Sequence, residues 1–117
     1  MQQNETFEQR VASIRRRFID GLDARLDSID LSLCAGEDAT SNERHARKIH
    51  RLFHDLAGNA AMLELEAVER SIRKGVEIAQ IADSRGEALS DESIMRLREV
   101  LAGTRSVARD LQEATCQ

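Results

Sequence analysis

Apolar residues return at steps of three and four along most of the chain, which is the spacing of one face of an α-helix. In the first segment this stripe is unbroken and predicts one long helix of about 28 residues. Its members are Val11, Ile14, Phe18, Leu22, Leu26, Ile29 and Leu33. The helix should end near Ala35 and Gly36, because glycine readily takes the left-handed conformation that closes a helix.

Two more stripes follow a polar linker. The second stripe holds Ile49, Leu52, Phe53, Leu56, Ala60 and Leu63, and the third holds Leu65, Val68, Ile72, Val76 and Ala79. Thr40, with Glu43 three residues later, fits a reciprocal capping box and predicts the start of the second helix. The third stripe begins so soon after the second that only a very short turn, near residues 62–64, can join the two helices.

The third helix should fade within residues 83–86, and Ser90 is the expected N-cap of a fourth. Asp91 and Glu92 give this last helix an acidic first turn, which suits its positive dipole end. Its inner face reads Ile94, Leu97, Leu101, Ala108 and Leu111. Four amphipathic helices with short links predict an all-α fold, an antiparallel up-down-up-down four-helix bundle that forms a single domain over residues 1–117.

Composition narrows the function classes. Of the 117 residues, 41% are apolar and 32% are charged, which supplies both a core and well-solvated outer faces. The net charge is −4 with both signs interleaved, so we expect no nucleic-acid partner. No apolar run approaches the ~18 residues of a membrane span, and residues 1–5 lack the basic start of a secretory signal. We therefore expect a cytoplasmic protein without a membrane partner.

The two cysteines, Cys34 and Cys116, lie far apart in the sequence and form no CxxC pair. This suits free thiols in a reducing compartment. In the predicted topology they fall at opposite ends of the bundle, which argues against an intramolecular disulfide.

The most unusual segment is residues 54–61. Gly58 follows His54 by four residues, so both lie on one face of the predicted second helix. A glycine inside a helix costs roughly 0.5–1 kcal/mol relative to alanine, so its presence needs a reason. One reason is tight packing of helices, but Gly58 lies off the apolar stripe. We favour the other reason, that a patch without side chains beside His54 lets another protein approach.

The face that carries His54 also holds Arg47, His50 and Arg51. A neutral imidazole is a nucleophile that titrates near physiological pH, so His54 could accept and release a phosphoryl group. Arg51, one turn earlier, could hold a phosphoryl oxygen or an acidic partner surface. The simpler alternative is an ordinary solvated basic face.

A metal site is a further alternative, because His50 and His54 have the i, i+4 spacing of helical metal-binding pairs. However, the segment lacks the glutamate of HExxH, and the flanking arginines repel a cation. We therefore expect no metal and no cofactor.

The segment His54-x-Leu56-x-Gly58, followed by small residues, resembles the HxLKG signature of histidine-containing phosphotransfer domains. Those domains are four-helix bundles of multistep phosphorelays. The resemblance implies that His54 carries a phosphoryl group on Nε2 and that Gly58 clears space for a receiver domain. It also implies response-regulator receiver domains and a hybrid sensor kinase as partners. The chain would then be a monomeric phosphotransfer intermediate rather than an independent enzyme.

Two positions depart from the family pattern. Ala57 replaces the usual lysine three residues after the histidine, and Glu64 replaces the usual glycine ten residues after it. Arg51 or Arg73 could supply the missing cation. The expected docking residues are Gly58, Arg51, Arg47, Ala57 and Ala61. Gln80 or Arg73 on the third helix could orient the His54 ring through Nδ1, although both fit ordinary exposed positions equally well.

Two rival functions stay open. In sensor-kinase dimerisation domains a histidine is followed by an acidic residue, as in His54-Asp55-Leu56, but Asn59 stands where such segments usually carry proline. A dimer would favour that rival. The other is a helical adaptor in which His54 is incidental, and replacing His54 would then leave partner binding and output intact.

Overall fold

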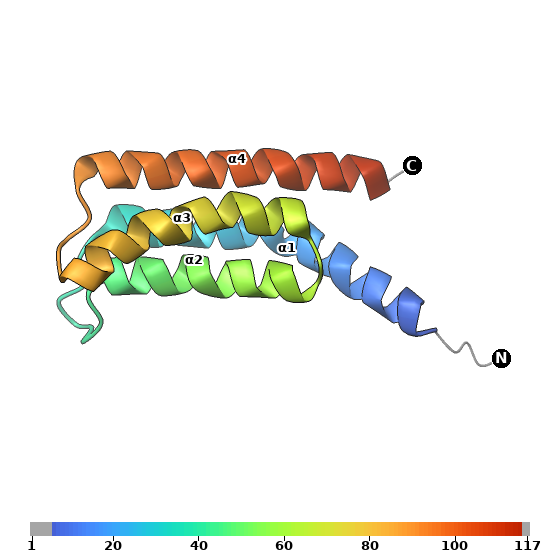
Figure 1. Ribbon diagram of the computed structural model, residues 1–117, viewed down its shortest axis with the longest axis horizontal. Coiled ribbons are helices and arrows are strands. Elements are labelled where there is room, and N and C mark those ends of the chain that lie inside the picture. Colours follow the sequence, from blue (N-terminus) through green and yellow to red (C-terminus); the bar gives the residue numbers. More distant parts are fainter. Residues whose placement is uncertain (1–5, 116–117) are drawn as a thin grey trace.

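The computed structural model describes residues 6–115, which form the predicted antiparallel four-helix bundle (Figure 1). The helices are α1 (Phe7–Ala35), α2 (His45–Met62), α3 (Glu66–Arg85) and α4 (Asp91–Thr115). In the bundle α2 packs on α3, α3 on α4, and α4 on α1, with a smaller contact between α1 and α2. Cys116 lies outside the described residues, and Cys34 is an exposed free thiol near the end of α1.

The start of α1 is fixed by a reciprocal capping box that was not predicted from the sequence. The Gln9 backbone N–H donates to Thr6 Oγ1 at 3.1 Å, and the Thr6 backbone N–H donates to Gln9 Oε1 at 2.9 Å. Two backbone donors that the helix leaves without partners are thereby satisfied. The pattern Thr6-x-x-Gln9 was visible in the sequence and points directly to this helix start.

The capping box predicted for α2 is wrong. This helix begins at His45 with Arg44 as N-cap, and no side chain of the N-cap residue bonds its first turn. Thr40 instead donates its hydroxyl to Asp38 Oδ1 at 2.6 Å. The carboxylate of Glu37 accepts from the His45 backbone N–H at 3.2 Å, so the linker supplies the missing acceptor from further back in the chain.

The remaining helix ends follow the sequence closely. Ser90 caps α4 by accepting from the Ser93 backbone N–H at 3.1 Å. Gly86 closes α3 in the left-handed conformation, with φ 67°, and Gly36 follows α1 with φ 74°. In the short turn between α2 and α3, Glu64 has φ 57°, which makes it the one residue other than glycine within residues 6–115 with positive φ.

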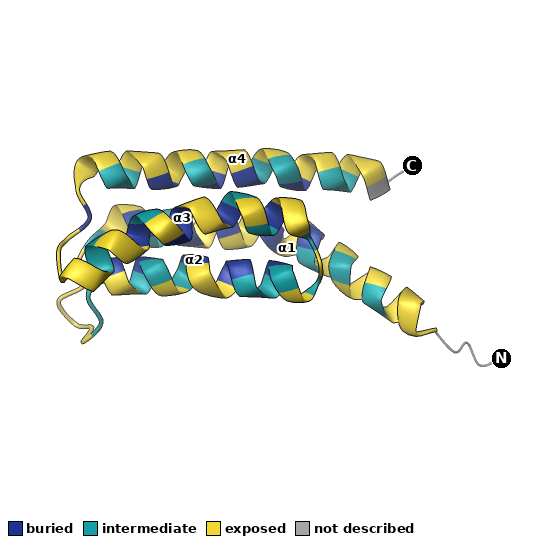
Figure 2. Ribbon diagram, viewed as in Figure 1, coloured by how far each residue is buried: buried dark blue, intermediate teal, exposed yellow. Residues whose placement is uncertain are grey.

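The core runs through the middle of the bundle, where each helix turns its apolar stripe inward (Figure 2). The largest fully buried apolar side chains are Phe53, Leu22, Leu26, Leu33, Ile49, Leu56, Ile72, Leu97 and Val68. The predicted stripe of α1 is only partly in this core. Ile14 is 50% exposed, and the first turns of α1 extend past the ends of α2 and α3 (Figure 1).

One close contact locks α2 against α3. A Cβ atom added to Gly75 of α3 would lie 2.3 Å from Cε1 of Phe53, so the phenyl ring occupies the space that a larger residue would fill. Phe53 is fully buried and directly precedes His54. Successive residues of a helix point about 100° apart, so burying Phe53 fixes the direction of His54.

Across the described residues, no helix is both long and apolar enough to cross a membrane.

Candidate functional site

His54 stands on the outer surface of α2, as the sequence predicts. Its side chain is exposed, and within residues 6–115 no hydrogen bond or ion pair engages either ring nitrogen. The ring has one aromatic neighbour, His50, whose ring centre is 6.2 Å away with the planes nearly perpendicular at 79°. Both nitrogens of His54 are therefore open to a reagent or a partner protein.

The other two histidines are held by the protein. His45 is buried, and its Nε2 lies 2.9 Å from the carbonyl oxygen of Ser32, to which it donates. His50 is half-buried, and its Nδ1 lies 2.9 Å from Oδ2 of Asp83. Among the three histidines, His54 alone combines an exposed ring with two unengaged nitrogens.

The carboxylate of Asp83, near the end of α3, contacts three basic side chains at the N-cap and in the first turns of α2. Its Oδ1 accepts from Arg44 Nη2 at 2.9 Å and from Arg47 Nε at 3.3 Å, while Oδ2 faces His50. The hydrogen bond from His50, followed by that from Arg47, lowers the pKa of Asp83 below its ordinary value. Arg47, predicted as a docking residue, is exposed but anchored to this carboxylate.

Arg51 is also paired within the chain. Its Nε and Nη2 donate to the two carboxylate oxygens of Glu43, each at 2.9 Å, which forms a bidentate ion pair. This hydrogen bonding raises the pKa of Arg51 and lowers the pKa of Glu43. Arg51 remains exposed on the His54 face, but it must leave Glu43 before it can bind a phosphoryl oxygen.

Gly58 leaves open space one turn beyond His54. A Cβ atom added there would meet no other group of the chain within 4 Å, so packing between helices does not require this glycine. Ala61, one turn further, is half-buried. Ala57 was predicted to line the same docking surface, but it is fully buried in the core, so a partner cannot contact it. It faces inward because it follows Phe53 by one helical turn.

The residues predicted to orient the His54 ring do not contact it. Arg73 pairs with Glu69 on its own helix at 2.8 Å, and Gln80 is exposed. Within residues 6–115 neither forms a hydrogen bond with His54. The histidine whose Nδ1 is held by another helix is His50, and no sequence pattern pairs it with Asp83, 33 residues away.

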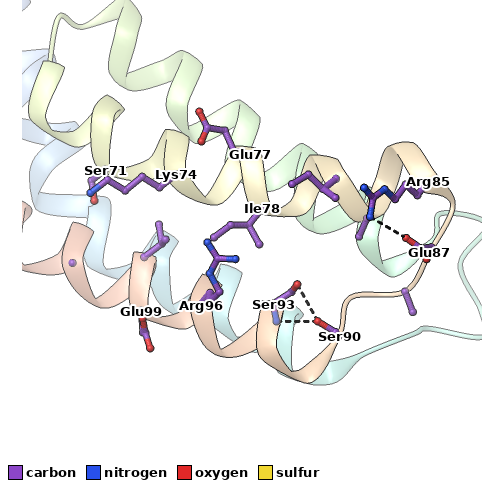
Figure 3. A pocket seen from close by; sticks show the side chains of 15 residues that line it. Ser71, Lys74, Glu77, Ile78, Arg85, Glu87, Ser90, Ser93, Arg96 and Glu99 are labelled. Carbon is purple, nitrogen blue, oxygen red and sulfur yellow. Dashed lines mark hydrogen bonds and ion pairs between the residues drawn. The ribbon is translucent and has the colours of Figure 1, made fainter.

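A groove of about 790 Å³ runs between α3 and α4, away from His54. Figure 3 shows Ile78 of α3 and Arg96 of α4 reaching toward each other across it. Its walls carry both signs of charge, with Lys74 and Arg96 alongside Glu77 and Glu99. This mixture selects no particular class of ligand.

Among the described residues, no group of three or more His, Cys, Asp and Glu side chains is arranged to hold a metal ion.

Comparisons of the chain with protein-family models, with curated proteins and with solved structures find no match.

Proposed function

We propose that the chain is a histidine phosphotransfer domain that carries a phosphoryl group on His54 between receiver domains of a two-component phosphorelay. The observation that carries this proposal is the state of the His54 ring, which is exposed and free of partners among the described residues. A ring needed for structure would be held as His45 and His50 are held. Gly58 adds a gap in the surface through which a partner can reach that ring.

The proposed chemistry needs only a nucleophile and a donor. Nε2 of neutral His54 attacks the phosphorus of an acyl phosphate on the receiver domain, while Nδ1 keeps its proton. The N–P bond forms as the P–O bond breaks, and the leaving carboxylate of the receiver keeps the electron pair. The reverse step returns the phosphoryl group to a second receiver. The rigid bundle contributes by presenting the ring at a fixed position.

The test is incubation of the chain with a phosphorylated receiver domain, followed by detection of an acid-labile, base-stable label. We expect the label in the wild type and none in His54→Gln, which should keep the same helical content and unfolding temperature. Label that survives this substitution would place the phosphoryl group on another residue. Receiver binding and signalling output that both persist in His54→Gln would instead support the helical adaptor.

The sensor-kinase alternative gains one observation from the structure. The first turns of α1 expose Phe7 by 76% and Ile14 by 50%, an apolar surface that a second copy of the chain could cover. Sedimentation of the purified chain separates the two functions. A stable dimer that dissociates in Ile14→Asp favours a dimerisation domain, and a monomer favours the transfer domain.

A further inference from the structure

His50 is oriented through one of its ring nitrogens. Its Nδ1 lies 2.9 Å from Oδ2 of Asp83, and a carboxylate only accepts hydrogen bonds, so Nδ1 carries a hydrogen. The other nitrogen, Nε2, has no hydrogen-bond partner among residues 6–115. The side chain is 25% exposed, so this free nitrogen is not sealed in the core.

The carboxylate that holds His50 is itself fixed. The Asp83 side chain is 11% exposed, and its other oxygen accepts from Arg44 and Arg47. Arg44 also donates to the backbone carbonyl of Asp83 at 3.1 Å. The orientation of His50 therefore follows from the packing of the start of α2 against the end of α3, not from a flexible surface contact.

This fixed ring lies beside the ring of His54. The two residues lie one helical turn apart, with ring centres separated by 6.2 Å. At this spacing, a group bonded to the His54 ring comes within hydrogen-bond reach of His50 when the free Nε2 of His50 faces that group. The arginines of the site have other partners, since Arg51 is paired with Glu43 and Arg73 with Glu69.

We infer that His50 is a positioning residue, whose protonated ring donates from Nε2 to an oxygen of a phosphoryl group on His54 while Asp83 holds Nδ1. This inference rests on the proposed function. The protonated His50 ring then lies between two anions, the Asp83 carboxylate and the phosphoryl group. A neutral ring presents a lone pair at Nε2 instead, which repels the phosphoryl oxygens. The contribution of His50 therefore belongs to the protonated ring and is absent from the neutral ring.

The test uses phosphoramidate, a small donor that needs no partner protein. The full chain is labelled, and the lifetime of phosphorylated His54 is followed by phosphorus NMR at about pH 6 and about pH 8.5, on either side of the usual range of histidine titration. We expect His50→Gln to shorten the lifetime about fivefold at the lower pH, as the loss of one charge-assisted hydrogen bond at a partly exposed site implies. At the higher pH the two lifetimes should agree.

Three further variants separate positioning from a merely structural role. His50→Lys restores a cation and should keep a long lifetime at both pH values. Asp83→Asn releases the ring and should shorten the lifetime at the lower pH. Arg109→Gln is the control, because it removes an exposed cation on α4, a helix without contacts to α2 among the described residues, and it should leave the lifetime unchanged.

The outcomes are distinct. Equal lifetimes for the wild type and His50→Gln at both pH values overturn the role of His50 and leave the proposed function standing. Label on the His50 ring overturns the role of His50 and the choice of His54 as acceptor. A wild-type chain that takes no label on histidine from either phosphoramidate or a phosphorylated receiver overturns the proposed function and this inference together.

Discussion

Gly75 of α3 lies directly against the ring of Phe53 of α2, so close that a Cβ atom on Gly75 would be 2.3 Å from Cε1 of that ring. Gly75→Ala therefore forces Phe53 or the helix backbone to move. Overpacking of this kind costs about 1–3 kcal/mol, against roughly 0.5–1 kcal/mol that alanine gains over glycine inside a helix. We expect a net loss of up to about 2.5 kcal/mol in the free energy of unfolding, measured by urea denaturation.

Gly103 on α4 provides the matched control. It is also helical, but a Cβ atom there would meet nothing within 4 Å. Gly103→Ala should therefore stabilise the fold by about 0.5–1 kcal/mol through helix propensity alone. If Gly75→Ala and Gly103→Ala shift stability in the same direction, the contact between Gly75 and Phe53 does not constrain the packing of α2 on α3.

Glu64 occupies a backbone conformation that favours glycine. A φ of 57° costs a residue with a Cβ atom about 1–2 kcal/mol relative to glycine. The greater freedom of glycine in the unfolded chain offsets about 0.4–1 kcal/mol of this difference. The ion pair with Arg15 at 3.7 Å adds little, because the Glu64 side chain is 81% exposed. Glu64→Gly should therefore raise the unfolding free energy by up to about 1.5 kcal/mol.

Glu64→Ala tests the cause of that gain. It removes the same carboxylate but keeps a Cβ atom, so the strain of the turn stays. Thermal unfolding should show a higher midpoint for Glu64→Gly and no increase for Glu64→Ala. A matching increase in both variants would assign the effect to the lost charge instead of the backbone.

The sequence predicted the parts of this molecule that depend on local periodicity. The bundle, the Ser90 cap and the exposure of His54 follow from where apolar and polar residues fall around a helix. The prediction of a capping box at Thr40 failed because the hydroxyl bonds Asp38 within the linker. The sequence pattern does not show which of several nearby groups such a hydroxyl will bond. The close contact at Gly75 and the pairing of His50 with Asp83 could not be predicted in this way, because both depend on how two helices pack together.

Ala57 shows the same limit at the site itself. The family pattern places a cation at this position, which suggested a surface residue, yet Ala57 shares the buried face of Phe53 and Ala60. The resemblance pointed to this segment and to His54 as the proposed phosphoryl acceptor, but it did not show which face of α2 turns toward the core. That rotation is set by the packing of Phe53 against α3.

The Asp83 cluster should make stability depend on acid pH. Its hydrogen bonds with His50 and then Arg47 lower the folded pKa of Asp83, so the ionised carboxylate favours folding above the ordinary aspartate pKa of about 3.9. This contribution is lost as the pH falls through the lowered folded pKa. The stability difference between wild type and Asp83→Asn should therefore be largest near neutral pH and shrink below about pH 4.

Urea denaturation at a series of pH values measures this difference. Asp55→Asn is the control, because Asp55 is an exposed carboxylate on α2 that forms no ion pair within residues 6–115. Its stability difference from the wild type should stay small across the same series. A difference for Asp83→Asn that does not change with pH would show that packing, not charge, is what the carboxylate contributes.

Gly58 gives the sharpest test of docking, because a side chain added there has room within the chain itself. Gly58→Leu would fill the gap beside His54, and its Cβ atom would meet no other group within 4 Å. The free protein should stay folded, and phosphoramidate should still label His54 at the wild-type rate because a small donor needs no surface contact. Transfer from a phosphorylated receiver should slow by about tenfold or more, since each 1.4 kcal/mol of lost docking is a factor of ten.

Gly21→Leu on α1 is the control for this variant. Gly21 is exposed and, like Gly58, is helical and free of neighbours within 4 Å, but it lies on a different helix from His54. Both labelling routes should run at the wild-type rate in Gly21→Leu. If Gly58→Leu accepts the phosphoryl group from the receiver as fast as Gly21→Leu does, the partner does not approach over Gly58. The gap in the surface would then have no part in recognition, and the docking face would have to lie on the opposite side of the His54 ring, toward Arg47 and Arg51.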